Sequence, residues 1–231
     1  MCGRYVSPDI KTVETIWPVA QAACKPFGRR YNVLPGTMIP ALRGDPSTKG
    51  LIVIEARWGF IPPWWKQSRL PSHCFTERSE DADHKPMWSP AFRSSRCLIP
   101  ADGWYEWSGV ERIKAKAADT PRQPHFIFRP EGPVCFAGVM SLWKLDGHLP
   151  LITCAILTRP ASPALNTIHN RMPVVLPHAA CIDWVDPRLQ HPAQIASVMQ
   201  QAVTDFSYYP VDTRLNNATD DDEALVKPIA S

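Results

Sequence analysis

Short runs of β-branched and aromatic residues dominate the middle of the chain. Such runs, when Gly, Pro and Asp separate them, are typical of β-strands, and here they predict strands over residues 51–60, 96–100, 104–107, 125–129, 134–143, 150–158, 172–176 and 206–211. Ser7 followed by Pro8 predicts a helix that starts there and runs to about Trp17. Further helices are expected over 178–185 and 191–203, and the polar segment 108–123 is expected to be a long hairpin loop.

The order of these elements predicts the fold class. Strands fill the middle, helices lie at the edges, and no regular alternation of strand and helix appears, so an α+β fold with mainly antiparallel sheet is expected. The chain has 231 residues, of which 45% are hydrophobic and 20% charged, close to the averages for globular proteins. We therefore expect one domain over residues 1–231, whose acidic segment 220–231 is packed or partly flexible.

The sequence carries no sign of export or of a metal scaffold. No apolar run approaches the roughly 20 residues that span a bilayer, and the N-terminus lacks a secretory signal, so a cytoplasmic protein without a membrane partner is expected. The seven cysteines include no CxxC pair, and a zinc site from His73, Cys74 and His84 lacks a fourth ligand. We expect no metal and no cofactor. Apolar surroundings predict buried thiols at Cys97, Cys135, Cys154 and Cys181.

Between residues 57 and 96 basic side chains alternate with tryptophans. The net charge of +3 does not by itself indicate nucleic acid, although the acidic block 220–223 masks part of a positive charge. Cations interleaved with exposed aromatic rings suit single-stranded nucleic acid, because phosphates attract charge and unpaired bases stack on flat apolar surfaces. The alternative is a tryptophan-rich core with a solvated basic rim.

Cys2 is the first candidate for chemistry because of its position. Removal of Met1 would leave an α-amine and a thiol on adjacent carbons, which is a 1,2-aminothiol. The amine can attack an aldehyde to give an imine, and the sulfur can close onto the same carbon to give a thiazolidine. The second step is intramolecular, which removes a large entropic barrier. The alternative is a dispensable surface cysteine, since a thiol is reactive only in a suitable environment.

Several motifs along the chain together resemble the SRAP family, the SOS-response-associated peptidases. They are MCGRY at residues 1–5, RYNVLPGT at 30–37, WGFIPPWW at 58–65, ERSE at 77–80, RCLIPADGWYEW at 96–107 and HNRMPVVL at 169–176. The resemblance covers most of the chain in the right order. It implies a single α+β domain with coiled, barrel-like sheets and peripheral helices. It also implies covalent capture of abasic sites in single-stranded DNA through the N-terminal cysteine during the DNA damage response.

The resemblance assigns roles to individual residues. Cys2 would be the nucleophile, Glu106 the carboxylate beside its amine, and His169 the proton donor and acceptor that opens the deoxyribose ring. Imine formation requires both an acid and a base, which a His-carboxylate pair supplies near pH 7. Met1 would be removed by the protein itself or by an aminopeptidase. The residues expected to contact DNA are Arg4, Asn32, Pro35, Trp64, Trp65, Arg78, Trp107 and Arg171.

One position departs from the family pattern. Thr76 stands where the family usually has the asparagine of N-A-R, and Glu77 follows it where alanine is common. The asparagine is thought to bind the sugar-derived part of the adduct, and threonine offers only a shorter hydroxyl. Thr76 is therefore a candidate site residue whose effect on capture the sequence leaves open.

Two other functions remain open from the residues. The first is a cysteine-type peptidase acting on other proteins, through Cys2 or through Cys74 with His169. The second is a non-catalytic binder of single-stranded DNA. If the resemblance to the family is set aside, Glu106 is interpreted as a buried structural acid and His169 as a turn residue. The arginines are then expected to form ion pairs with Glu77, Glu80 or Glu106. We expect a monomer, associated with the nucleoid if the host is bacterial.

Overall fold

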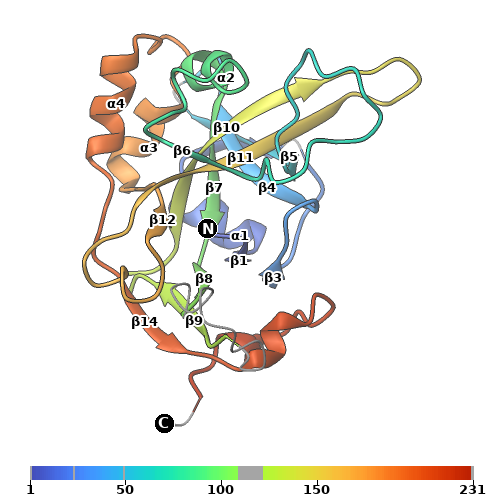
Figure 1. The fold of residues 1–231 in the computed structure, drawn as a ribbon. Coiled ribbons are helices and arrows are strands. Elements are labelled where there is room, and N and C mark those ends of the chain that lie inside the picture. Colours follow the sequence, from blue (N-terminus) through green and yellow to red (C-terminus); the bar gives the residue numbers. More distant parts are fainter. Residues whose placement is uncertain (1, 23, 49, 109–121, 230–231) are drawn as a thin grey trace.

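The computed structural model describes residues 2–22, 24–48, 50–108 and 122–229, and across them the strands form two sheets (Figure 1). The smaller sheet has the order β14-β9-β8-β1-β3 and is antiparallel throughout. Its strands are β1 (Arg4–Ser7), β3 (Arg30–Val33), β8 (Gly103–Trp107), β9 (Pro124–Phe128) and β14 (Ser207–Pro210). The first strand of the chain therefore lies inside the sheet, between β8 and β3.

The larger sheet closes into a ring. Its order is β12-β11-β10-β7-β4-β5-β2, and β5 also pairs with β11 in parallel, with Cys154 opposite Trp58. These strands are β2 (Val19–Ala22), β4 (Met38–Gly44), β5 (Leu51–Trp58), β7 (Arg96–Ala101), β10 (Val134–Trp143), β11 (Leu151–Pro160) and β12 (Arg171–Pro173). Two short strands extend it: β6 (Thr76–Arg78) pairs with β11, and β13 (Val175–Leu176) pairs with β10.

Aromatic side chains from both sheets fill the ring. The ring centroids of Tyr5 on β1 and Trp58 on β5 are 5.3 Å apart, and those of Trp104 on β8 and Phe136 on β10 are 5.9 Å apart. We call this cluster of buried side chains, to which Cys2 also belongs, the barrel core. Edge-to-face contacts of this kind favour one arrangement of the two sheets.

Helices lie at the periphery. They are α1 (Ile10–Ile16), α2 (Ser89–Ser94), α3 (His178–Val185) and α4 (Pro192–Gln200), with 3-10 turns η2 (Thr213–Asn216) and η3 (Glu223–Val226). The helices α3 and α4 lie side by side on one flank (Figure 1). Buried Arg96 donates to the carbonyl oxygens of Phe92 at 2.9 Å and Asp186 at 2.6 Å, which ties α2 and the end of α3 to β7. None of the described helices is long and apolar enough to cross a membrane.

The predicted α+β class with mainly antiparallel, barrel-like sheets is confirmed. The predicted helix start at Ser7 is wrong, because Ser7 ends β1 and the side chain of Asp9 caps α1 by accepting from the backbone nitrogen of Thr12 at 2.8 Å. Strand 172–176 divides at Val174, whose nitrogen donates to Leu157 and whose oxygen accepts from Ala137, both at 2.8 Å. Of the expected loop 108–123, residues 109–121 lie outside the described residues.

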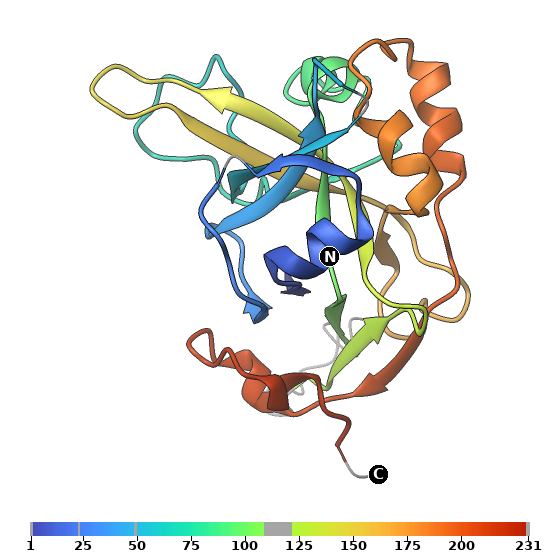
Figure 2. The same ribbon diagram turned by 180° about the vertical axis from the view of Figure 1, so that it is seen from behind.

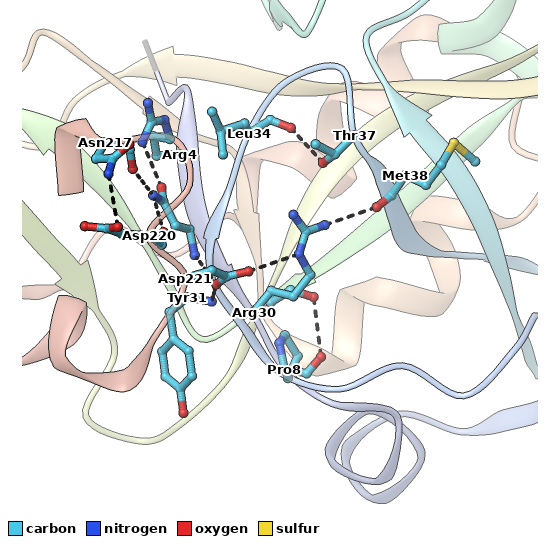
Figure 3. Close-up of polar contacts among 12 residues, drawn as sticks. Arg4, Pro8, Arg30, Tyr31, Leu34, Thr37, Met38, Asn217, Asp220 and Asp221 are labelled. Atoms are coloured by element: carbon cyan, nitrogen blue, oxygen red, sulfur yellow. Dashed lines mark hydrogen bonds and ion pairs between the residues drawn. The ribbon is translucent and has the colours of Figure 1, made fainter. Parts of the chain in front are cut away.

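The C-terminal segment 212–229 crosses the end of the molecule formed by β3, β8 and β9 (Figures 1 and 2). Leu215 and Leu225 are buried there. One carboxylate oxygen of Asp221 accepts from the backbone nitrogens of Tyr31 and Asn32, and the other lies 3.5 Å from Nε of Arg30 (Figure 3). Since β3 is the edge strand of the smaller sheet, Asp221 satisfies amides that would otherwise form an open edge.

Substitution Asp221→Ala is expected to destabilise the protein by about 1–3 kcal/mol, because it removes charge-assisted hydrogen bonds to two β3 amides. The free energy of unfolding in urea measures the change. Asp205→Ala is the matched control, since Asp205 is exposed and no side-chain hydrogen bond or ion pair to it is found among the described residues. Equal losses in the two variants would show that Asp221 does not secure β3.

Candidate active site

The pairing of β1 with β8 brings Cys2 and Glu106 together. Arg4 lies opposite Tyr105 and Tyr5 opposite Trp104, so the residues before Arg4 run past the end of β8 that carries Glu106. Both side chains are buried, Cys2 with 0% and Glu106 with 3% of its surface exposed. The strand register therefore positions Glu106 and brings Cys2, two residues before β1, to the same end of β8.

Burial determines the protonation of this pair. It raises the pKa of the Glu106 carboxyl to about 7, and it raises the pKa of the Cys2 thiol, to which the nearby charge of Glu106 adds. The thiol is therefore protonated at neutral pH, whereas the carboxyl exists in both forms. A carboxyl that titrates near pH 7 can donate and accept protons in successive steps of one reaction.

His169 closes the turn that leads from β11 to β12. Its backbone nitrogen donates to Leu165, and its Nδ1 lies 3.0 Å from the nitrogen and 3.1 Å from the oxygen of Arg171. Leu165 and Met172, on either side of His169, belong to the barrel core that also contains Cys2. These contacts fix the orientation of the imidazole, and burial lowers its pKa, so the ring is neutral at pH 7.

Thr76 lies at the start of β6, buried and opposite Ile156 of β11 in a parallel register. Ile156 belongs to the barrel core, so Thr76 borders the same cluster as Cys2. Its neighbour in the sequence, Glu77, forms an ion pair of 2.6 Å with Lys85. The negative charge that departs from the family pattern is thus compensated within the protein.

Arg171 forms an ion pair with Glu80, as expected if this arginine has a structural role. Its guanidinium is bonded to Glu80 and donates from Nη2 to the backbone oxygen of Thr158 at 2.6 Å. The bond from Arg171 lowers the pKa of the Glu80 carboxyl to about 2. Thr158 in turn donates to the backbone oxygen of Glu77 at 3.1 Å. The network joins β6, β11 and β12 beside His169.

Three of the residues expected to contact DNA are bonded to the C-terminal segment. Nη1 of Arg4 donates to Asn32 at 2.9 Å and to the oxygen of Leu215 at 2.7 Å. Asn32 donates to the oxygens of Asn217 at 3.1 Å and Asp220 at 2.8 Å (Figure 3), and Nε1 of Trp107 donates to Asn216 at 2.9 Å. Burial lowers the pKa of Arg4.

The remaining candidates lie nearer to solvent. Trp64 is 56% exposed and its ring centroid is 6.1 Å from that of half-buried Trp65. Trp143 of β10 donates to the backbone oxygen of Trp65 at 2.8 Å, which anchors this loop. Pro35 is half-buried in the turn before Gly36, where a positive φ of 90° favours glycine. Arg78 is exposed, and its guanidinium makes no hydrogen bond to the described residues.

The tryptophans between residues 57 and 96 do not share one environment. Trp58 and Trp88 are buried, as expected for a tryptophan-rich core, whereas Trp64 is exposed, as expected for a surface that binds nucleic acid. The predicted burial of Cys97, Cys135, Cys154 and Cys181 is confirmed. Within the described ranges no three His, Cys, Asp or Glu side chains converge as a metal site.

Two residues were not predicted from the sequence. Asp221 binds the backbone of β3, and only its place in the acidic block 220–223 could have drawn attention to it. His125 lies opposite Glu106 in the pairing of β8 with β9.

Comparison with known proteins identifies the family. A family model described as SOS response associated peptidase (SRAP) matches residues 1–218. A Bacillus subtilis (strain 168) protein, named abasic site processing protein YoaM, is 31% identical over 234 residues, which are 98% of this chain and 97% of that protein. The chain therefore belongs to the SRAP family, as its motifs predicted.

Further proteins are similar over most of this chain. The abasic site processing protein YedK of Escherichia coli (strain K12) is 27% identical, and the match covers 99% of this chain and all of that protein. A crystal structure of a phage-related protein from Bordetella bronchiseptica is 28% identical with a TM-score of 0.67, covering 91% of this chain and 94% of that one. A second structure from the same organism has a TM-score of 0.74 at 21% identity, with 91% and 100% covered, and supports the fold alone.

The raised pKa of Glu106 makes a prediction about stability. The folded state binds the Glu106 proton more tightly than the unfolded chain does. Protonated Glu106 therefore contributes its full share to the free energy of unfolding below about pH 4.5, and this contribution is lost as the pH rises through about 7. Glu106→Gln removes this titration. The difference in melting temperature, variant minus wild type, should therefore increase as the pH is raised from 5 to 8. The exposed Glu55→Gln is the control, and parallel pH curves for wild type and both variants would contradict a raised pKa.

Proposed function

We propose that the protein captures abasic sites in single-stranded DNA as a covalent crosslink through Cys2. The observation that carries the proposal is the burial of Cys2 beside a carboxyl whose pKa burial raises to about 7. Its relatives YoaM and YedK carry the name abasic site processing protein, which supports the same lesion as substrate. An abasic site exposes an aldehyde in its ring-opened form, and an aldehyde is what an aminothiol captures.

The chemistry requires one acid-base group beside the amine. Carboxylate Glu106 takes a proton from the α-ammonium group of Cys2, and the neutral nitrogen attacks the aldehyde carbon. The carbonyl electron pair moves to oxygen, which takes up the proton that the nitrogen releases. Glu106 then protonates this hydroxyl, the C–O bond breaks, and water leaves an iminium ion.

The thiol completes the crosslink. The Cys2 thiol gives its proton to Glu106, its sulfur bonds to the iminium carbon, and the C=N electron pair returns to nitrogen. The products are a thiazolidine and one water. Burial keeps the thiol protonated until this step, so Glu106, which gave its own proton to the leaving hydroxyl, takes up the thiol proton in its place. The reaction needs no oxidant and no cofactor.

His169 is assigned to the step before capture. Opening of the deoxyribose ring moves a proton from the anomeric hydroxyl to the ring oxygen, and a neutral imidazole can carry out both transfers. Burial lowers the pKa of His169, so the neutral form is present at pH 7. The hydroxyl of Thr76, across the barrel core, would hold the opened sugar with fewer hydrogen bonds than an amide provides.

Single-stranded DNA suits the surface around the site. Trp64 offers an exposed face for stacking and Arg78 an exposed guanidinium for phosphate. Arg4, Asn32, Trp107 and Arg171 are held by other protein groups, so in this proposal they shape the wall of the cleft and supply positive charge. A missing base removes local stacking, so the lesion enters such a pocket at low energetic cost.

Met1 must be removed before Cys2 can react, because only then is the α-amine on the same residue as the thiol. Glu106 is the group that we assign to assisting this cleavage, a step that is consistent with the family's description as a peptidase. Cleavage of other proteins by Cys74 is disfavoured. Its thiol donates to the oxygen of Ser72 at 3.3 Å, and burial raises its pKa, so the thiolate that peptide cleavage needs is scarce at pH 7 and, unlike at Cys2, no α-amine on the same residue makes the first attack.

A crosslinking assay tests the proposal. Mature protein mixed with a single-stranded oligonucleotide carrying one abasic site should give a band that survives denaturing electrophoresis. Cys2→Ala should abolish it, and Glu106→Gln and His169→Ala should slow its formation by about 100-fold, as for the loss of a general acid-base group. Cys74→Ala is the matched thiol control and should crosslink at the rate of wild type.

Intact mass of the same samples reports whether Met1 is absent. A wild-type sample that lacks Met1 and gives no covalent band would overturn the proposed function. A wild-type sample that binds intact and abasic strands alike and gives no covalent band would instead support the non-catalytic binder.

A further inference from the structure

His125 lies directly across the sheet from Glu106. In the antiparallel pairing of β8 with β9, Trp104 faces Ile127, Tyr105 faces Phe126 and Glu106 faces His125. Side chains of directly opposed residues point to the same face, with Cβ atoms about 4.5–5.5 Å apart. The sequence motifs did not draw attention to this histidine.

The face that His125 shares with Glu106 is the face of the reactive cysteine. Trp104 and Ile127, which flank the pair on that face, belong to the barrel core together with Cys2. The intervening residues Tyr105 and Phe126 point the other way, toward Leu215 in the C-terminal segment. The alternation along both strands therefore assigns the imidazole to the side of the sheet on which capture is proposed.

The surroundings of His125 hold the ring at the border between this site and solvent. Its Nδ1 lies 3.2 Å from the backbone oxygen of Gln123, and its ring centroid is 6.1 Å from that of Tyr208 on β14. The side chain is half-buried, and burial lowers its pKa. Among the described residues, the titratable side chains that face it from neighbouring strands are Glu106 on β8 and Tyr208 on β14.

We propose that His125 is a positioning residue of the crosslinking site, whose imidazole controls the protonation of Glu106 from the neighbouring strand. The inference rests on the proposed function and adds to it the regulation of its acid-base group. An imidazole and a carboxyl that interact from directly opposed positions on one face of a sheet titrate as a pair that shares one proton over part of the pH range. When the shared proton lies on His125, the imidazolium stabilises the Glu106 carboxylate.

His125 is expected to change how the rate of crosslinking falls at acidic pH. Glu106 must be ionised to accept the proton of the Cys2 ammonium group. With His125 present, part of the singly protonated pair retains the carboxylate below pH 7. Without His125 the carboxyl stays protonated to higher pH, because a nearby opposite charge favours the ionised form. His125 thus extends crosslinking toward lower pH.

A packing role is the alternative, since His125 contacts the ring of Tyr208 as an aromatic pair would. His125→Phe separates the two roles, because phenylalanine retains a flat ring in a half-exposed position but cannot carry a charge. His178→Phe is the matched control, because His178 is an exposed histidine at the start of α3. Thermal melts of both variants show whether the fold is retained.

The test measures the crosslinking rate against pH with the abasic oligonucleotide, in wild type and in His125→Phe. The acid limb of the rate profile should move up by about one pH unit in His125→Phe, with a smaller change at pH 8. In a Glu106→Gln background, the same substitution should not move the limb, since the group through which His125 acts is then absent. His178→Phe should follow the wild-type curve.

The outcomes separate this inference from the function on which it rests. An unchanged acid limb in His125→Phe, with wild type still crosslinking, overturns the role of His125 and leaves the proposed function standing. A uniform loss of rate at every pH, equal in both backgrounds, assigns His125 to packing and also overturns it. No crosslink by mature wild type at any pH overturns the proposed function itself.

Discussion

The antiparallel pairing of β1 with β8 is the interaction on which the site depends. It draws the start of the chain into the smaller sheet, between β8 and β3, and places Cys2 where the ring of the larger sheet is filled with aromatic side chains. Glu106 is carried into the same dry surroundings, which raise its pKa to about 7. Without the ring the carboxyl would be solvated and ionised at neutral pH, and it would not serve as an acid.

The two faces of the smaller sheet are used differently. One face holds Glu106 and His125 against the barrel core, and the other is covered by segment 212–229, whose backbone binds Arg4 and Asn32. Segment 212–229 thus holds in place the residues of one wall of the predicted DNA cleft, while Trp64 on a loop and Arg78 at the end of β6 remain exposed. A rigid wall with a few exposed contacts suits a strand whose backbone must be guided to one reactive atom.

The sequence alone predicted the fold class, because runs such as residues 134–143 have a strong strand pattern. Strands that contain Pro or polar residues were missed: β4 contains Pro40 and Arg43, and β1 was obscured by the expected helix start at Ser7. The family motifs predicted Cys2, Glu106 and His169 as site residues, and these roles stay a proposal. Contacts between distant segments were beyond reach, because the bonds from Arg4 to Leu215 and from Asn32 to Asp220 span most of the chain and follow no local pattern.

Thiazolidine capture requires that both nucleophiles of Cys2 bond to one aldehyde carbon. Tandem mass spectrometry of the digested adduct, after treatment with a thiol-alkylating reagent, tests it most directly. We predict an N-terminal peptide that begins at Cys2, carries the opened sugar less one water, and has no alkyl group on its sulfur. A peptide that carries the sugar but is alkylated at Cys2, or one that still begins at Met1, would contradict the account.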